Sequence, residues 1–224
     1  MPKHDIFLLF QEKYRFNIGK PMVFCPGCRE VQQCKQKELW RCITMLYAPV
    51  KKNVLLSSYY KCQTCKRRFA TSVDWANLSP SNALEHALLC AMVRVRGANG
   101  RFRRAEATIV RDAYIRMTQH EQNTKNTSLD GKGIIPSEDD IKLCSRHMKN
   151  ITQEAGIEED FMPYLVEKLT DNDKKLVVRG MACVTLNKKQ MEPKEAIEIE
   201  VVGNILGLDP ATVHEVTTNW NAKG

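Results

Sequence analysis

The spacing of apolar positions changes about one third of the way along the chain. Before residue 76, apolar residues gather in short runs rich in β-branched and aromatic side chains, of which 39–50 and 53–62 are the longest. Runs of this composition are typical of strands. The polar pair Lys51 and Lys52 separates them, so the pattern predicts a long β-hairpin with its turn at these two lysines.

The opening 20 residues have a different character. They mix apolar and charged positions and end at Gly19 and Pro21, two residues that interrupt regular structure. We therefore expect a short amphipathic lead-in over 1–20, followed by the β-rich segment.

From Pro80 onward, apolar residues recur every three or four positions, which is the spacing of one helix face. Ser79 suits the N-cap and Pro80 the first turn of the first helix. Capping and stop signals predict further helices over 103–118, from Ser137, within 158–170, after Thr170, over 193–207 and from Pro210. The polar, glycine-rich stretch 121–136 is predicted to be an exposed loop.

These patterns predict an α+β chain with a small β-rich segment over 21–76 and an all-helical domain over 79–224. Within the helical part, four residues recur at an offset of 89 positions. Met92, Val95, Glu106 and Ala107 correspond to Met181, Val184, Glu195 and Ala196. The repeat predicts two helical hairpins of similar design that pack together.

Charge is distributed unevenly along the chain. Residues 1–80 hold 14 Lys and Arg against 5 Asp and Glu, a net charge of +9, whereas residues 125–224 have a net charge of −4. A basic half favours an acidic partner, such as nucleic acid or an acidic protein surface. The apolar run "IFLLF" is too short for a secretory signal, and no stretch reaches the length of a membrane span. We therefore expect a soluble, cytoplasmic protein.

Four of the nine cysteines form two CxxC pairs, Cys25 with Cys28 and Cys62 with Cys65, separated by 33 residues. Two such turns supply the four thiolates of a closed tetrahedral zinc site, and the spacer is long enough for the predicted hairpin. The pattern therefore predicts one structural Zn²⁺.

Other interpretations of the cysteines stay open. A redox CxxC normally opens a helix after a strand in a βαβ unit, and the sequence shows no such unit. Cys34 or Cys42 could replace one of the four ligands, or the thiols could be unligated. Cys90, Cys144 and Cys183 lie on apolar helical stripes and are expected to act as small buried hydrophobic residues.

The stretches "FCPGC", "LWRCITMLYAPV" and "YYKCQTCKRRF" together resemble the Cys₄ zinc ribbon at the start of certain bacterial proteins. In those proteins the ribbon leads into a helical domain similar to the tellurite-resistance protein TerB. Residues 84–118 and 171–218 look like the two halves of that fold. The resemblance implies a zinc ribbon followed by a TerB-like all-α domain.

The loops "RGANGRFRRAE" and "LNKKQMEPKE" stand where the TerB-like family has an Ala-Asp-Gly loop followed by Glu. Family members often carry acidic residues there, which suit divalent cations. This chain has Asn99, Arg103 and Lys188 at such positions instead. We therefore expect no divalent cation in the helical part.

No sequence motif of a hydrolase, kinase, nucleotide-binding or metalloprotease site is present. The five histidines are scattered, and His86 and His147 are expected to pack within helices. The sequence thus favours a non-enzymatic adaptor or scaffold that docks other proteins. The resemblance implies an accessory subunit of a bacterial multi-protein assembly, such as a type IV secretion coupling complex, which would be peripheral to the membrane through its partners.

Partner binding is expected to use basic residues of the β-rich segment and of the first helical loop. They are Lys51, Lys52, Lys61, Lys66, Arg67, Arg68, Arg101, Arg103 and Arg104. The alternative is a zinc ribbon that binds nucleic acid. Basic side chains can hold phosphates, and the aromatic rings next to them can stack on nucleobases.

Overall fold

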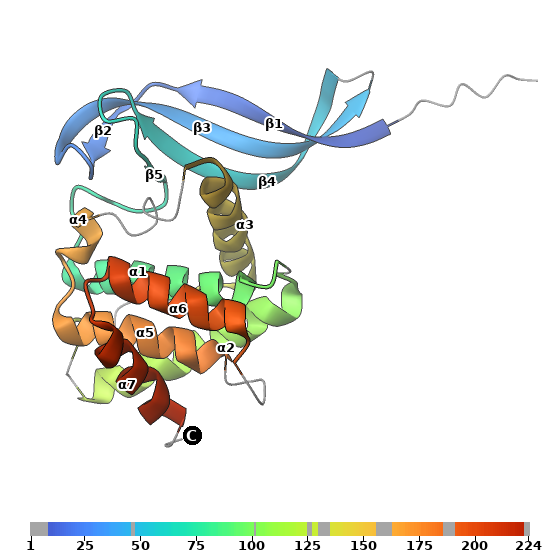
Figure 1. Cartoon of the computed structure of the whole chain (residues 1–224). Coiled ribbons are helices and arrows are strands. Elements are labelled where there is room, and N and C mark those ends of the chain that lie inside the picture. The colour runs from blue at the N-terminus through green and yellow to red at the C-terminus, as the bar shows by residue number, and fades with distance from the viewer. Residues whose placement is uncertain are drawn as a thin grey trace, which may run out of the picture. The chain divides into compact units, whose positions relative to one another are not determined.

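The computed structural model describes residues 9–45, 48–100, 102–124, 127–129, 135–155, 163–185 and 191–221. The chain divides into two compact units, Met1–Val73 and Asp74–Gly224, whereas the predicted boundary lay at 76–79. The first unit is an antiparallel sheet and the second is helical, which confirms the α+β layout (Figure 1).

The β unit is built around one long central strand, β3. The strands are β1 (Leu9–Gly19), β2 (Met22–Cys25), β3 (Glu30–Met45), β4 (Ala48–Cys62) and β5 (Arg68–Ala70). The sheet order is β1-β3-β4-β5, all antiparallel, and β2 also pairs with β3. Both β2 and β4 are therefore aligned by the same strand.

The predicted lead-in over 1–20 needs correction, because Leu9–Gly19 is strand β1 of the sheet. Its described side chains alternate regularly between exposed and half-buried, from exposed Gln11 to half-buried Phe16. Lys13, Arg15 and Asn17 alternate with Tyr14, Phe16 and Ile18, so the sequence carries this period of two directly after the apolar run at 6–10. Residues 1–8 lie outside the described ranges.

The predicted hairpin turn at Lys51 and Lys52 is also wrong. Both lysines lie within β4 and pair with Ile43 and Cys42 of β3, and the two strands are instead joined at residues 46–47, outside the described ranges. Residues 48–53 are all exposed. The polar run thus marks an exposed part of a strand rather than a turn.

The helical unit contains seven helices in its described residues. They are α1 (Pro80–Gly97), α2 (Arg104–Thr124), α3 (Glu138–Ala155), α4 (Pro163–Val166), α5 (Asp171–Thr185), α6 (Pro193–Ile205) and α7 (Pro210–Asn221). The predicted helix starts agree to within a residue for α1, α2, α3, α5, α6 and α7. None of these helices combines the length and the apolar character needed to cross a membrane.

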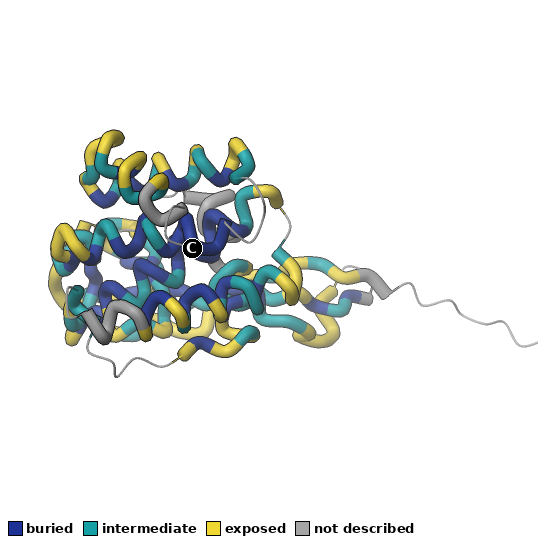
Figure 2. The backbone as a smooth tube through the Cα atoms, turned by 90° about the horizontal axis from the view of Figure 1, so that it is seen from below, coloured by how far each residue is buried: buried dark blue, intermediate teal, exposed yellow. Residues whose placement is uncertain are grey.

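The helical core is centred on the contact between α1 and α5. Met92 and Met181, equivalent positions of the repeat, are both fully buried, and buried residues follow the inward sides of the helices (Figure 2). A Cβ at Gly180 would lie 2.4 Å from Cδ1 of Leu88 and 3.0 Å from Cε of Met92. Glycine at this position lets the two helices approach closely.

The repeated glutamates cap helices. Oε2 of Glu106 accepts the backbone N–H of Arg103 at 3.0 Å, and Oε2 of Glu195 accepts that of Glu192 at 2.9 Å. Each carboxylate thus satisfies a donor at the start of its helix, where the first N–H groups have no intrahelical acceptor. The two hairpins of the repeat share this device.

The predicted exposed loop over 121–136 also needs correction. Residues 121–124 continue helix α2, and Pro136 is buried. Ser128 donates its backbone N–H to Oδ1 of Asp173 at 2.8 Å and its hydroxyl to Oδ2 at 2.6 Å. Because Asp173 is fully buried, this part of the segment is fixed to the start of α5.

Candidate metal centre

The first cysteine pair lies where a strand ends in a tight turn. Cys25 is the last residue of β2, and Cys28 lies in the turn that leads to β3. The backbone N–H of Arg29 donates to the carbonyl oxygen of Cys25 at 2.7 Å and closes the turn. Arg29 has a φ of 61°, a left-handed conformation that few residues other than glycine adopt.

The second pair repeats this design. Cys62 ends β4, Cys65 lies in the following turn, and Lys66 has a φ of 64°. The backbone N–H of Thr64 donates to Sγ of Cys62 at 3.3 Å. Both turns thus place a left-handed residue directly after their second cysteine.

Strand β3 holds the two turns together. Its residue Gln33 accepts the backbone N–H of Gln63 at 3.1 Å, and its neighbour Gln32 accepts the hydroxyl of Thr64 at 2.8 Å. Cys34 pairs with Cys62 across β3 and β4. The second turn is therefore fixed to the strand that follows the first.

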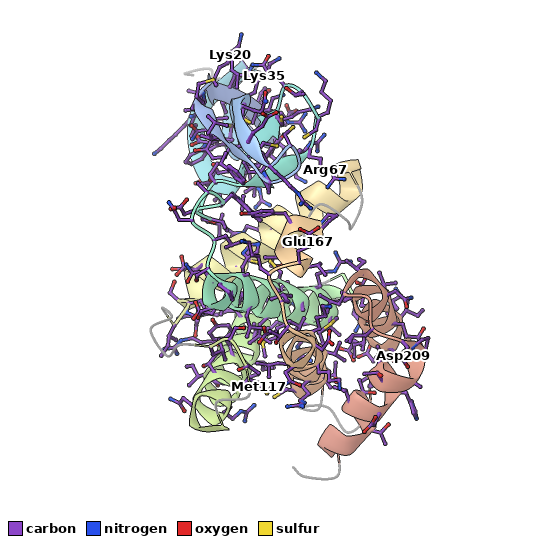
Figure 3. All side chains as sticks on the ribbon, turned by 90° about the vertical axis from the view of Figure 1, so that its left-hand side faces the viewer. Lys20, Lys35, Arg67, Met117, Glu167 and Asp209 are labelled. Carbon is purple, nitrogen blue, oxygen red and sulfur yellow. The ribbon has the colours of Figure 1, made fainter. Side chains whose placement is uncertain are left out.

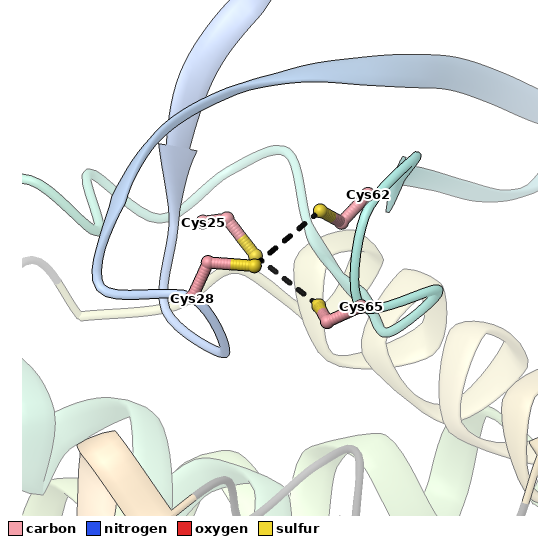
Figure 4. Close-up of side chains that lie close together, drawn as sticks. All are labelled: Cys25, Cys28, Cys62 and Cys65. Carbon is pink, nitrogen blue, oxygen red and sulfur yellow. Dashed lines mark hydrogen bonds between the residues drawn. The ribbon is translucent and has the colours of Figure 1, made fainter.

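The four sulfurs converge (Figure 4). Sγ of Cys25 lies 3.6 Å from Sγ of Cys65, and Sγ of Cys28 lies 3.8 Å from Sγ of Cys62. All four ligand atoms lie within 4.8 Å of one another. Among the residues that the structure describes, this is the only group of three or more His, Cys, Asp or Glu side chains that could hold a metal ion.

The size of the cluster fits a tetrahedral ion. Four thiolates at about 2.3 Å from a central ion lie about 3.8 Å from one another, close to the two sulfur distances given above. The four cysteines could therefore hold a metal ion, as the sequence predicted for Cys25, Cys28, Cys62 and Cys65.

The surroundings of Cys62 favour the ionised form of its thiol. Burial opposes ionisation of Cys62, but the backbone N–H groups of Cys65 and Thr64 point at its sulfur and hold its pKa at about 6. For Cys25, burial outweighs the nearby backbone N–H groups and raises the pKa well above its usual range. Because ligands must be deprotonated, metal binding displaces the remaining thiol protons and strengthens as pH rises.

Gly27 is required by the close approach of the two turns. A Cβ at this position would lie 3.1 Å from Sγ of Cys65 and 2.8 Å from Cδ of Arg67. The arginine side chain can move aside, but the sulfur has a fixed place in the cluster. The glycine of the first CxxC pair therefore leaves room for a ligand of the second.

Cys34 lies beside the cluster without belonging to it. It is fully buried, and burial raises its pKa to about 12, which keeps it a neutral thiol.

We expect the Cys34→Ala variant to retain one metal ion per chain. The Cys28→Ser variant should lower metal affinity by more than about 100-fold, because even groups that only support the ligands of a metal change its affinity by 10–100-fold. Elemental analysis of the two purified variants would measure this. Equal metal loss in both would make Cys34 a ligand.

The predicted partner-binding residues of the β unit do not all lie on one face of the sheet, because Lys51 and Lys52 pair with neighbouring residues of β3. Lys52 lies 4.4 Å from the ring centroid of Phe16 and 3.8 Å from Oε2 of Glu38, so it is engaged within the sheet. Arg68 lies over the ring of Tyr59 at 5.6 Å. Lys51, Lys66 and Arg67 are exposed and Lys61 is half-buried.

The remaining predicted residues belong to the helical unit. Arg103 is exposed at the start of α2, and Arg104 pairs with Glu138 at 3.0 Å. Arg101 lies outside the described residues. The nine positions are thus divided between the two units.

A second cysteine cluster lies in the helical unit. Sγ of Cys90 is 3.7 Å from Nε2 of His86, whose ring meets Trp75 edge-on at 5.8 Å. Cys90 and Cys183 are buried, as predicted, whereas Cys144 is half-buried. Hydrogen bonding to Cys144 and burial raise the pKa of Cys90 well above its usual range, so this thiol is not an activated nucleophile.

No family model matches the chain, and the searches of curated proteins and of solved structures found no match either. The zinc ribbon and the TerB-like domain accordingly remain predictions from the sequence. The interpretation of function rests on the geometry of the described residues.

Proposed function

We propose that this chain is a non-catalytic adaptor in which one structural Zn²⁺ shapes the β unit for docking to other proteins. The observation that carries the proposal is the closed set of four cysteine sulfurs, all within 4.8 Å of one another. Four thiolates fill the tetrahedral coordination of Zn²⁺ and leave no position for a substrate or water. An ion held in this way stabilises a fold rather than performing a reaction.

An exposed apolar patch beside the metal cluster supports docking to protein. Met22 and Val31 are 62% and 57% exposed. Met22 pairs with Gln33, and Phe24 pairs with Val31, so all three apolar side chains lie on one face of the β2–β3 pair. Large exposed apolar side chains that adjoin one another are typical of interaction sites.

The resemblance to bacterial ribbon proteins suggests the setting of this adaptor. We propose an accessory subunit of a bacterial multi-protein assembly, of which a secretion-system coupling complex is one form. The adaptor would reach a membrane only through its partners.

Co-purification of the tagged full-length chain from nuclease-treated native lysate tests this function. We expect a protein partner in stoichiometric amount, and we expect Met22→Asp/Val31→Asp to lose it while keeping the bound metal. Val50→Asp is the matched control, because Val50 is also 62% exposed but lies in β4. Recovery of the wild-type chain alone at low ionic strength would refute the adaptor function.

A further inference from the structure

The register of the sheet separates charged side chains between its two faces. Residues paired across antiparallel strands lie on the same face, and alternate residues along a strand share a face. Lys35 pairs with Lys61, which in turn pairs with Arg68, so these three cations form a row across β3, β4 and β5. Lys13 pairs with Arg41 on the same face, nearer the other end of the sheet.

Extending this register defines the cationic face of the sheet. Its charged residues are Lys13 and Arg15 on β1, Lys35, Lys37 and Arg41 on β3, Lys51 and Lys61 on β4, and Arg68 on β5. No carboxylate lies on this face among the described residues of the sheet. Glu12 and Glu38 lie on the opposite face, together with Lys52.

The cations of this face are close together, and most of them are exposed. Neighbouring strands lie about 4.8 Å apart, and alternate residues on one strand are about 6.8 Å apart. Lys13, Arg15, Lys35 and Arg41 are exposed, and Lys35 can be seen on the β unit in Figure 3. Burial lowers the pKa of Lys37 from its usual value. Four neighbouring cations lower it further, namely Arg15, Lys61, Lys35 and Arg68.

Grouping these cations is unfavourable in the isolated chain. Like charges directly opposite each other destabilise a sheet, and here Lys35 faces Lys61 and Lys13 faces Arg41. An anionic polymer lying on the face would turn this repulsion into attraction. The zinc-stabilised hairpin keeps the cations in register until such a partner binds.

We propose that the cationic face binds nucleic acid through its phosphate backbone, without reading the bases. The face extends along β3 from Lys35 to Arg41, and its cations repeat in two directions, which suits a polymer with regularly spaced charges. Its aromatic residue Tyr59 is buried and lies under Arg68, so the face offers no exposed ring for base stacking. This function goes beyond protein docking and requires only the folded sheet.

The test uses the purified, metal-loaded full-length chain and fluorescently labelled 20-nucleotide DNA and RNA of mixed sequence. We expect binding that weakens steeply with salt and depends little on sequence. Lys35→Glu/Arg41→Glu should weaken binding by at least about 30-fold and reduce the salt dependence, because charge reversal removes two phosphate contacts.

A matched control removes the effect of total charge. Arg103→Glu/Lys194→Glu changes the net charge by the same amount in the helical unit, at exposed positions near helix starts where an acid is tolerated. We expect less than a threefold effect on nucleic-acid binding from this variant. Metal content and circular dichroism establish that each variant is folded, and the milder Lys35→Gln/Arg41→Gln replaces the first variant if it unfolds.

Several outcomes would overturn the inference. Equal loss of affinity in the two charge-reversed variants would show that only total charge matters. Binding that does not change with salt would exclude phosphate contacts, and tighter binding to phosphatidylserine vesicles than to nucleic acid would assign the face to a membrane. The adaptor function is tested separately, because its variants lie at Met22 and Val31 and its assay is carried out after nuclease treatment.

Discussion

Removal of the metal is expected to unfold the β unit and leave the helical unit folded. Half of the buried apolar side chains among the described residues of the β unit are cysteines: Cys25, Cys34, Cys42 and Cys62, beside Leu39, Leu56, Tyr59 and Phe69. A core of this size gives little stability by itself. Structural zinc contributes about 10 kcal/mol or more, comparable with the entire stability of a small domain.

The helical unit has no such dependence. Its core is built mainly from aliphatic side chains, among them the fully buried Leu84, Leu88, Met92 and Leu176. Hydrogen exchange followed by mass spectrometry, before and after chelation, would measure the two units separately. We expect amides of β3 and β4 to lose protection while those of α1 and α5 keep theirs.

The same measurement on Cys34→Ala provides the control, because that variant should unfold only when the metal is removed. Protection of β3 and β4 that survives complete loss of metal would contradict a structural role for the ion. It would also show that the hairpin is stable through its backbone pairing alone.

Replacement of Asp173 by alanine is expected to destabilise the helical unit by about 3 kcal/mol. The fully buried carboxylate accepts the backbone N–H of Thr170 at 2.8 Å as well as the two donors of Ser128. The hydroxyl of Thr170 accepts the backbone N–H of Asp173 in return, at 3.2 Å. Alanine therefore removes a capping box and leaves three donors without their charged acceptor.

Asp171 is the matched control for this prediction. It lies in the same first turn of α5, but its side chain is 86% exposed and pairs with Lys174, 3.2 Å away. Surface ion pairs of this kind contribute little, so Asp171→Ala should cost less than about 1 kcal/mol. Urea denaturation followed by helical circular dichroism would compare the two. Similar small effects would mean that Ser128 does not fix the segment between α2 and α3.

The features that the sequence predicted well have local signals. The CxxC pairs predicted the four-cysteine cluster because a turn of that length brings its two cysteines together. Helix starts were equally local: Ser79 accepts the backbone N–H of Asn82 at 3.1 Å, as an N-cap residue should. Both kinds of signal are complete within four residues.

The features that it missed depend on strand pairing. In β1 the alternation is confined to residues 13–18 and directly follows the apolar run at 6–10, so the whole segment was interpreted as an amphipathic lead-in. The hairpin has register irregularities between Leu39 and Trp40, Arg41 and Cys42, and Ile43 and Thr44, which shift the β4 partner at each point. The sequence does not mark these bulges, so it could not show that Lys35, Lys61 and Arg68 lie on one face. The basic residues were therefore grouped by their proximity in the sequence.

The pairing of Cys34 with Cys62 has a consequence for how the chain folds. A one-residue slip between β3 and β4 would turn Cys62 to the other face and move it about 3.4 Å along the strand. Its sulfur would then leave the cluster, and the turn that carries Cys65 would lose its hydrogen bonds to Gln32 and Gln33. Only one alignment of this bulged hairpin therefore brings the four sulfurs together, so metal binding would select chains whose strands have aligned correctly.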